Sequence, residues 1–75
     1  MSQETVMDTQ TEEARLVERL RAIGAVDLYE RVKASARHEV GRRKGCSLAQ
    51  LYREVVDQQV QFGGFPDWAL RYGPR

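Results

Sequence analysis

Apolar side chains recur at steps of three and four residues over positions 48–62, which places them on one face of a helix. These positions are Leu48, Leu51, Tyr52, Val55, Val56 and Phe62. Ser47 precedes the run, and Gln50 comes three residues after Ser47. That spacing is typical of a capping box, in which both side chains bind backbone N–H groups at the start of a helix. We therefore expect a helix that begins after Ser47 and buries Leu51 near the centre of its apolar face.

Glycine and proline predict how this helix ends. Gly63 and Gly64 interrupt the pattern, and Pro66 suits the first turn of a short closing helix. Gln59 lies within the apolar stripe, where an unpaired buried amide would cost about 1–3 kcal/mol. We therefore expect the helix to fray before Gln59, although a buried partner for the amide is the alternative.

An earlier helical pattern follows Thr9, which stands three residues before Glu12 in a second capping-box spacing. Apolar positions continue up to Gly24, a residue type that commonly ends helices. Residues 10–23 are thus predicted to form a helix. The polar segment 1–8 has no apolar period and is predicted to be a disordered tail.

A helix between these two is predicted over about residues 28–41, because Asp27 and Glu30 repeat the start signal and apolar positions follow one turn apart. No window of the sequence alternates apolar and polar residues as a half-buried strand would. We predict an all-α fold, a small bundle of three main helices plus a short C-terminal helix, with residues 9–75 forming a single domain.

Composition narrows the class of protein. The chain has 75 residues, with 12 Lys and Arg against 11 Asp and Glu, and one cysteine. This balance argues against a polybasic protein, and a lone cysteine excludes an intramolecular disulfide or a multi-cysteine metal site. No secretory signal or long apolar run is visible, so we expect a cytoplasmic protein without a membrane span, metal or cofactor. Because so small a domain buries only about 60% of its surface, a protein partner is expected and a homo-oligomer is possible.

Charge is distributed unevenly. Acids outnumber bases seven to three over residues 1–30, whereas bases outnumber acids six to one over residues 31–44. Four of those bases, which we call the basic edge, are Arg37, Arg42, Arg43 and Lys44. They suit an acidic protein surface, or DNA phosphates as in helix-turn-helix proteins. In the simplest interpretation they complement the helix dipole and stay solvated.

Two residues could carry chemistry. Cys46 follows two cations and precedes a helix N-terminus, an environment that makes thiols reactive, but a cysteine there also packs as a small apolar residue. His38 has no second histidine four residues away and cannot form a metal site. We predict packing for Cys46, a solvated or half-buried side chain for His38, and no catalytic site.

Aromatic residues gather towards the C-terminus: Phe62, Phe65, Trp68 and Tyr72. They could form a platform for a partner, but a small bundle also needs large side chains to close one end, and we expect the core role for most of them. Arg71 lies beside them and is expected to be exposed. Trp68, Arg71 and Tyr72 join the basic edge as candidate partner-binding residues, because aromatic residues and arginine dominate binding hot spots.

Residues 45–70 contain the run REVVDQQVQFGGFPDWAL, which resembles the C-terminal helix and turn of the carboxymuconolactone decarboxylase and alkylhydroperoxidase-D-like family. The register fits from Arg53 to Pro66, whereas residues 45–47 need one extra residue and the Cys-x-x-Cys pair of the redox members is absent. The resemblance covers at most half of the chain. It implies an all-helical fold that oligomerises and, if activity came with it, decarboxylase or peroxidase-like chemistry.

These patterns favour a small non-enzymatic regulator or adaptor that binds another protein, with transcriptional control as one possible setting. Two alternatives stay open. One is a DNA-binding regulator of the helix-turn-helix type. The other is a minimal carboxymuconolactone decarboxylase-like enzyme that uses Cys46 or His38.

Overall fold

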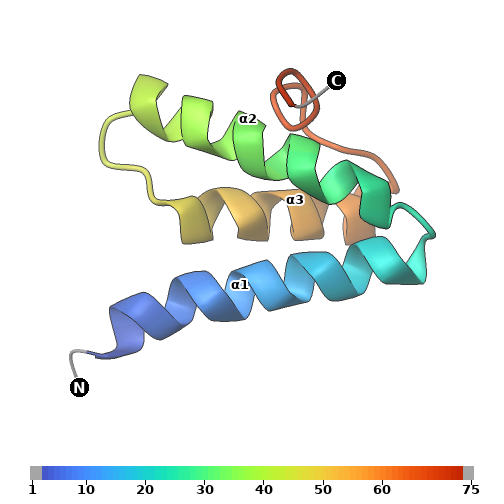
Figure 1. Ribbon diagram of the computed structural model, residues 1–75, viewed down its shortest axis with the longest axis horizontal. Coiled ribbons are helices and arrows are strands. Elements are labelled where there is room, and N and C mark those ends of the chain that lie inside the picture. The colour runs from blue at the N-terminus through green and yellow to red at the C-terminus, as the bar shows by residue number, and fades with distance from the viewer. Residues whose placement is uncertain (1–2, 74–75) are drawn as a thin grey trace.

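The computed structural model describes residues 3–73, with side chains described from residue 9 onward. Its elements are α1 (Gln3–Ala22), the 3-10 turn η1 (Val26–Leu28), α2 (Tyr29–Arg42) and α3 (Leu48–Phe62). No strand occurs within residues 3–73, so the predicted all-α class is confirmed. Figure 1 shows α1 and α3 running in the same direction and α2 running back, with the C-terminal segment folded over α2.

The predicted boundary residues of α3, Ser47 and Gly63, are confirmed. Ser47 Oγ accepts a hydrogen bond from the N–H of Gln50 at 3.3 Å, and the N–H of Ser47 donates to Gln50 Oε1 at 3.0 Å, which completes the capping box. At the other end Gly63 has a φ of 75°, a conformation that a side chain would disfavour. The helix between these residues runs from Leu48 to Phe62.

The start of α1 differs from the prediction, whereas its end agrees. The helix begins at Gln3 and passes through Thr9 without interruption, so Thr9 is not a cap and the tail predicted over residues 1–8 is helical from Gln3 onward. No glycine or proline lies in residues 3–22 to stop the helix. Met1 and Ser2 lie outside the described residues. After α1, the N–H of Gly24 donates to the Arg21 carbonyl at 3.1 Å and the N–H of Ala25 to that of Leu20 at 2.8 Å, a Schellman ending.

Asp27 does not cap α2, contrary to the prediction. It lies inside η1, and no side-chain cap bond forms at the start of η1 or of α2. Backbone groups supply the hydrogen bonds instead, since the N–H of Leu28 donates to the Ala25 carbonyl at 3.0 Å and the N–H of Tyr29 to the Val26 carbonyl. The 3-10 turn thus supplies the hydrogen-bond acceptors for N–H groups at the start of α2 that an acidic cap was expected to supply.

The core forms where the three helices and the C-terminal segment meet. Its buried apolar members are Leu16, Leu20, Val32, Ala36, Leu51, Tyr52, Val55, Trp68 and Ala69. The predicted burial of Leu51 is confirmed, but Phe62 is 74% exposed rather than part of the core. Gln59 takes the inward position in the last turns of α3, and its Nε2 donates to the Gly64 carbonyl at 3.2 Å. The predicted fraying before Gln59 is therefore wrong, because the amide has a partner.

The short C-terminal helix is also absent from the described residues. Two overlapping turns replace it, closed by hydrogen bonds from the N–H of Ala69 to the Pro66 carbonyl at 3.0 Å and from the N–H of Arg71 to the Trp68 carbonyl at 3.2 Å. Contacts with α2 determine the path of this segment. The N–H of Tyr72 donates to Ser35 Oγ at 2.9 Å, and Ser35 Oγ donates to the Tyr72 carbonyl at 3.1 Å. The segment is thereby held against α2 (Figure 1).

Candidate functional site

Three residues of the basic edge present their charges to solvent. Arg37 and Lys44 are exposed, and neither forms an ion pair with a carboxylate among residues 9–73. Arg42 is also exposed, although its Nη1 lies 3.6 Å from Oε1 of the buried Glu39. These three cations, along α2 and the loop after it, are available to a ligand.

Arg43 is also exposed, but its guanidinium forms ion pairs within the molecule. Its Nε donates to Glu39 Oε2 at 2.8 Å and its Nη1 to Glu54 Oε1 at 3.4 Å. The second oxygen of Glu54 accepts the indole N–H of Trp68 at 3.3 Å. Burial by itself would lower the pKa of Arg43, but the hydrogen bond and charge of Glu39 raise the pKa above its ordinary value. Arg43 therefore joins α2, α3 and the C-terminal segment.

The candidate partner-binding residues near the C-terminus also differ, because one lies in the core and two lie on the surface. Trp68 is only 5% exposed and belongs to the core, whereas Arg71 and Tyr72 are exposed. The Tyr72 ring stacks on the imidazole of His38, with ring centroids 3.9 Å apart and an angle of 13° between the planes. Tyr72, Arg71 and His38 thus belong to a surface that α2 and the C-terminal segment share.

The sequence patterns did not predict two buried carboxylates. Glu12 on α1 and Glu39 on α2 are each about as buried as Trp68. Helical spacing indicates that both residues face inward, since Glu12 lies one turn before the buried Leu16 and Glu39 lies one turn after the buried Ser35. Capping-box spacing assigns Glu12 to a helix start and composition assigns Glu39 to the local charge balance, so neither assignment predicts burial.

A tyrosine and a carboxylate join α1 to α2. The Tyr29 hydroxyl donates to Glu13 Oε2, and the Lys33 ammonium lies 5.2 Å from the centre of the Tyr29 ring. Burial, followed by the hydrogen bond to Glu13, raises the pKa of Tyr29 well above its ordinary value. Burial and the charge of Glu13 also raise the pKa of Tyr52, an effect that Arg37 opposes.

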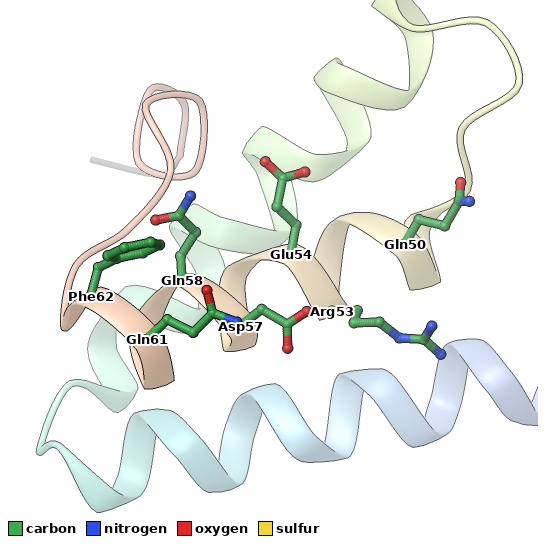
Figure 2. Close-up of a pocket in the computed structure, with 7 residues that line it drawn as sticks. All are labelled: Gln50, Arg53, Glu54, Asp57, Gln58, Gln61 and Phe62. Atoms are coloured by element: carbon green, nitrogen blue, oxygen red, sulfur yellow. The ribbon is translucent and has the colours of Figure 1, made fainter.

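A groove runs along the outer face of α3, and we call it the α3 groove. It is lined by Gln50, Arg53, Glu54, Asp57, Gln58, Gln61 and Phe62. Figure 2 shows two rows of side chains spaced by four residues, one through Glu54, Gln58 and Phe62 and the other through Arg53, Asp57 and Gln61. Such rows are the ridges between which a neighbouring helix packs. The periodicity of this helix predicts a buried Phe62, so it does not indicate the groove.

Cys46 and His38 have no partner that would activate them within the described residues. Cys46 is half-buried and packs against the core, and its Sγ lies 3.8 Å from the Ser47 carbonyl oxygen. His38 contributes the ring contact with Tyr72. Over the part of the chain that the structure describes, no group of three or more His, Cys, Asp and Glu side chains could hold a metal ion. No described helix is long and apolar enough to cross a membrane.

No protein-family model, no curated protein and no solved structure matches the chain. The resemblance of residues 45–70 to the carboxymuconolactone decarboxylase and alkylhydroperoxidase-D-like family therefore stays a prediction from the sequence. Any proposal of function is therefore based on the surface residues of this chain.

Proposed function

We propose that this chain is a small non-enzymatic regulator or adaptor that binds an acidic surface of another protein through its basic edge. The observation that carries the proposal is the exposure of Arg37, Arg42 and Lys44, of which Arg37 and Lys44 lack a carboxylate partner among residues 9–73. Exposed cations steer association with an acidic partner and fix its orientation. Arg71 and Tyr72 are exposed on the C-terminal segment and add an arginine and an aromatic ring to the same proposed surface.

The outer face of α3 favours protein over DNA as the ligand. In a helix-turn-helix arrangement α3 would be the helix that enters the major groove. Its outer face carries the carboxylate of Asp57, which forms no ion pair among residues 9–73 and would be repelled by phosphates. Gln59, whose amide could contact base edges only if it were exposed, is buried and bonded to the Gly64 carbonyl. A DNA-binding regulator is therefore the second candidate, supported by the basic edge alone.

A matched pair of variants tests the proposal. Arg37→Ala with Lys44→Ala removes two exposed charges of the basic edge, and Arg15→Ala with Arg21→Ala removes the same charge from α1. Each tagged full-length chain is used for pull-down from the native host, with and without nuclease, after circular dichroism has verified its fold. We expect the wild type and the α1 variant to retain a nuclease-resistant protein partner that the basic-edge variant loses.

Two outcomes would contradict the proposal. Equal recovery of every partner by both variants would show that the basic edge does not bind them. Recovery of nucleic acid, with proteins lost on nuclease treatment, would favour the DNA-binding alternative. In that case binding to duplex DNA should weaken steeply as salt is raised.

A further inference from the structure

The α3 groove lies between two rows of side chains that other elements hold in place. Arg53 extends towards α1, where its Nη2 donates to Glu12 Oε2 at 2.9 Å. Glu54, in the other row, binds Arg43 and the indole N–H of Trp68. One residue in each row is therefore held in place before any ligand binds, which lowers the entropy cost of binding.

The charge left in the groove is negative. Arg53 and Glu54 are paired with opposite charges, so their fields are largely compensated. Asp57 is exposed and forms no ion pair or hydrogen bond with another side chain among residues 9–73. A cation on the ligand would complement the Asp57 carboxylate, and the Gln58 and Gln61 amides beside it can bind polar groups of either kind.

The C-terminal end of the groove is apolar. Phe62 is the most exposed of the large hydrophobic side chains that the structure describes, at 74%. Asp57 and Phe62 are five residues apart, which separates them by about 7.5 Å along the axis of α3. On a second helix, residues four apart are separated by about 6 Å along its axis and share one face. Because five residues also turn α3 by about 140°, Asp57 and Phe62 belong to the two different rows that flank the groove. A helix seated between the rows can therefore place a cation against Asp57 on one side and an apolar side chain against Phe62 on the other.

We propose that the α3 groove binds an amphipathic helix of a partner protein that carries Lys or Arg four residues from a large apolar side chain. Rows of side chains spaced by four residues accept the ridge of such a helix. The cation lies against Asp57, and the apolar side chain covers Phe62. This site differs from the basic edge in the charge of its ligand, so the inference does not rest on the proposed function. A chain with both sites could hold two partners of opposite charge.

Labelled model peptides test this site on the full-length chain. The probes are alanine-based helical peptides of about 16 residues with Lys and Leu four apart, in both orders, and matched peptides with Glu in place of Lys. Fluorescence anisotropy gives each Kd, and amide chemical shifts of the labelled protein locate the binding. We expect at least one Lys peptide to bind about fivefold or more tightly than its Glu counterpart, with shifts concentrated along residues 50–62.

Three variants distinguish the groove from adventitious binding. Asp57→Asn should abolish the preference for Lys over Glu, and Phe62→Ala should raise the Kd of the Lys peptide by about fivefold or more. Val60→Ala, at an exposed apolar position of α3 outside the groove, should leave the Kd unchanged. The proposal is wrong if neither Lys peptide binds, if Lys and Glu peptides bind equally, or if Val60→Ala weakens binding as much as Phe62→Ala.

Discussion

Glu12 and Arg53 lie 41 residues apart in sequence, yet the Glu12 carboxylate accepts hydrogen bonds from both Nε and Nη2 of Arg53, at 3.2 and 2.9 Å. The side chain of Glu12 is almost completely buried, whereas that of Arg53 is 62% exposed. A buried carboxylate is costly unless it is paired, so the exposed guanidinium makes the inward position of Glu12 tolerable. The pair joins α1 to α3 and also positions Arg53, which belongs to one of the two rows that flank the α3 groove.

Arg53→Ala should lower the free energy of unfolding by about 1–3 kcal/mol, because among residues 9–73 the buried Glu12 would keep only the weaker contact with Arg15 at 3.7 Å. Arg21→Ala is the control, since Arg21 is exposed and forms no ion pair among residues 9–73. Urea unfolding followed by circular dichroism gives both values. Equal stabilities of the two variants would show that Glu12 does not depend on Arg53.

Leu51→Ala should cost about 2–5 kcal/mol, because Leu51 is fully buried where α3 meets the rest of the core. A domain of this size has little stability to lose, so we expect the variant to be partly unfolded at ambient temperature. Gln10→Ala, at an exposed position of α1, should leave the melting temperature nearly unchanged. Equal melting of the two variants would contradict the assignment of Leu51 to the core.

The signals that predicted α3 correctly are local ones. Ser47, Gln50 and Gly63 act within one turn of the backbone groups that they satisfy or redirect, so their effects can be read from spacing alone. Thr9 and Asp27 show the same spacing but do not cap a helix. At Thr9 the helix extends further towards the N-terminus. At Asp27 a 3-10 turn supplies the backbone hydrogen bonds at the start of α2. Such a signal indicates where a helix can begin, not where it must.

The remaining differences come from long-range contacts. Nothing near Arg43 in the sequence indicates that it binds Glu54 on α3 while Arg37 and Lys44 stay exposed. The turns after Pro66 likewise depend on Ser35, which binds the backbone of Tyr72. Periodicity describes which face of a helix is buried, but it does not say which charged residue finds a partner on another helix. The candidate surface could therefore be proposed from sequence, whereas its division into free and paired cations could not.

Trp68→Phe and Trp68→Ala should separate the two roles of this side chain. Phenylalanine retains most of the buried ring but leaves Glu54 without the indole N–H, so we expect a loss of about 0.5–1.5 kcal/mol. Alanine also removes the ring from the core, which should cost about 3–5 kcal/mol. Thermal and urea unfolding measure both losses. If Trp68→Phe is as destabilising as Trp68→Ala, the hydrogen bond to Glu54 outweighs the packing.

Tyr29 should make the fold sensitive to alkaline pH. Its pKa in the folded protein is raised above the ordinary value of about 10, by burial and by the hydrogen bond to Glu13. Below pH 10 the hydroxyl keeps its proton in both the folded and the unfolded chain, so its contribution to stability is constant. Above that pH the unfolded chain loses the proton first, and the free energy of unfolding must fall as pH rises.

Tyr29→Phe should therefore be less stable than the wild type near neutral pH, because the bond to Glu13 is lost, but should lose less stability between pH 9 and 11.5. Tyr72→Phe is the control, since the Tyr72 hydroxyl forms no hydrogen bond among the described residues and its ring contact with His38 can persist. Urea unfolding at several pH values gives the slopes, and lysine titration cancels in the comparison because all three proteins share the same lysines. A Tyr29→Phe slope equal to that of the wild type would mean that the Tyr29 hydroxyl titrates alike in the folded and unfolded chain.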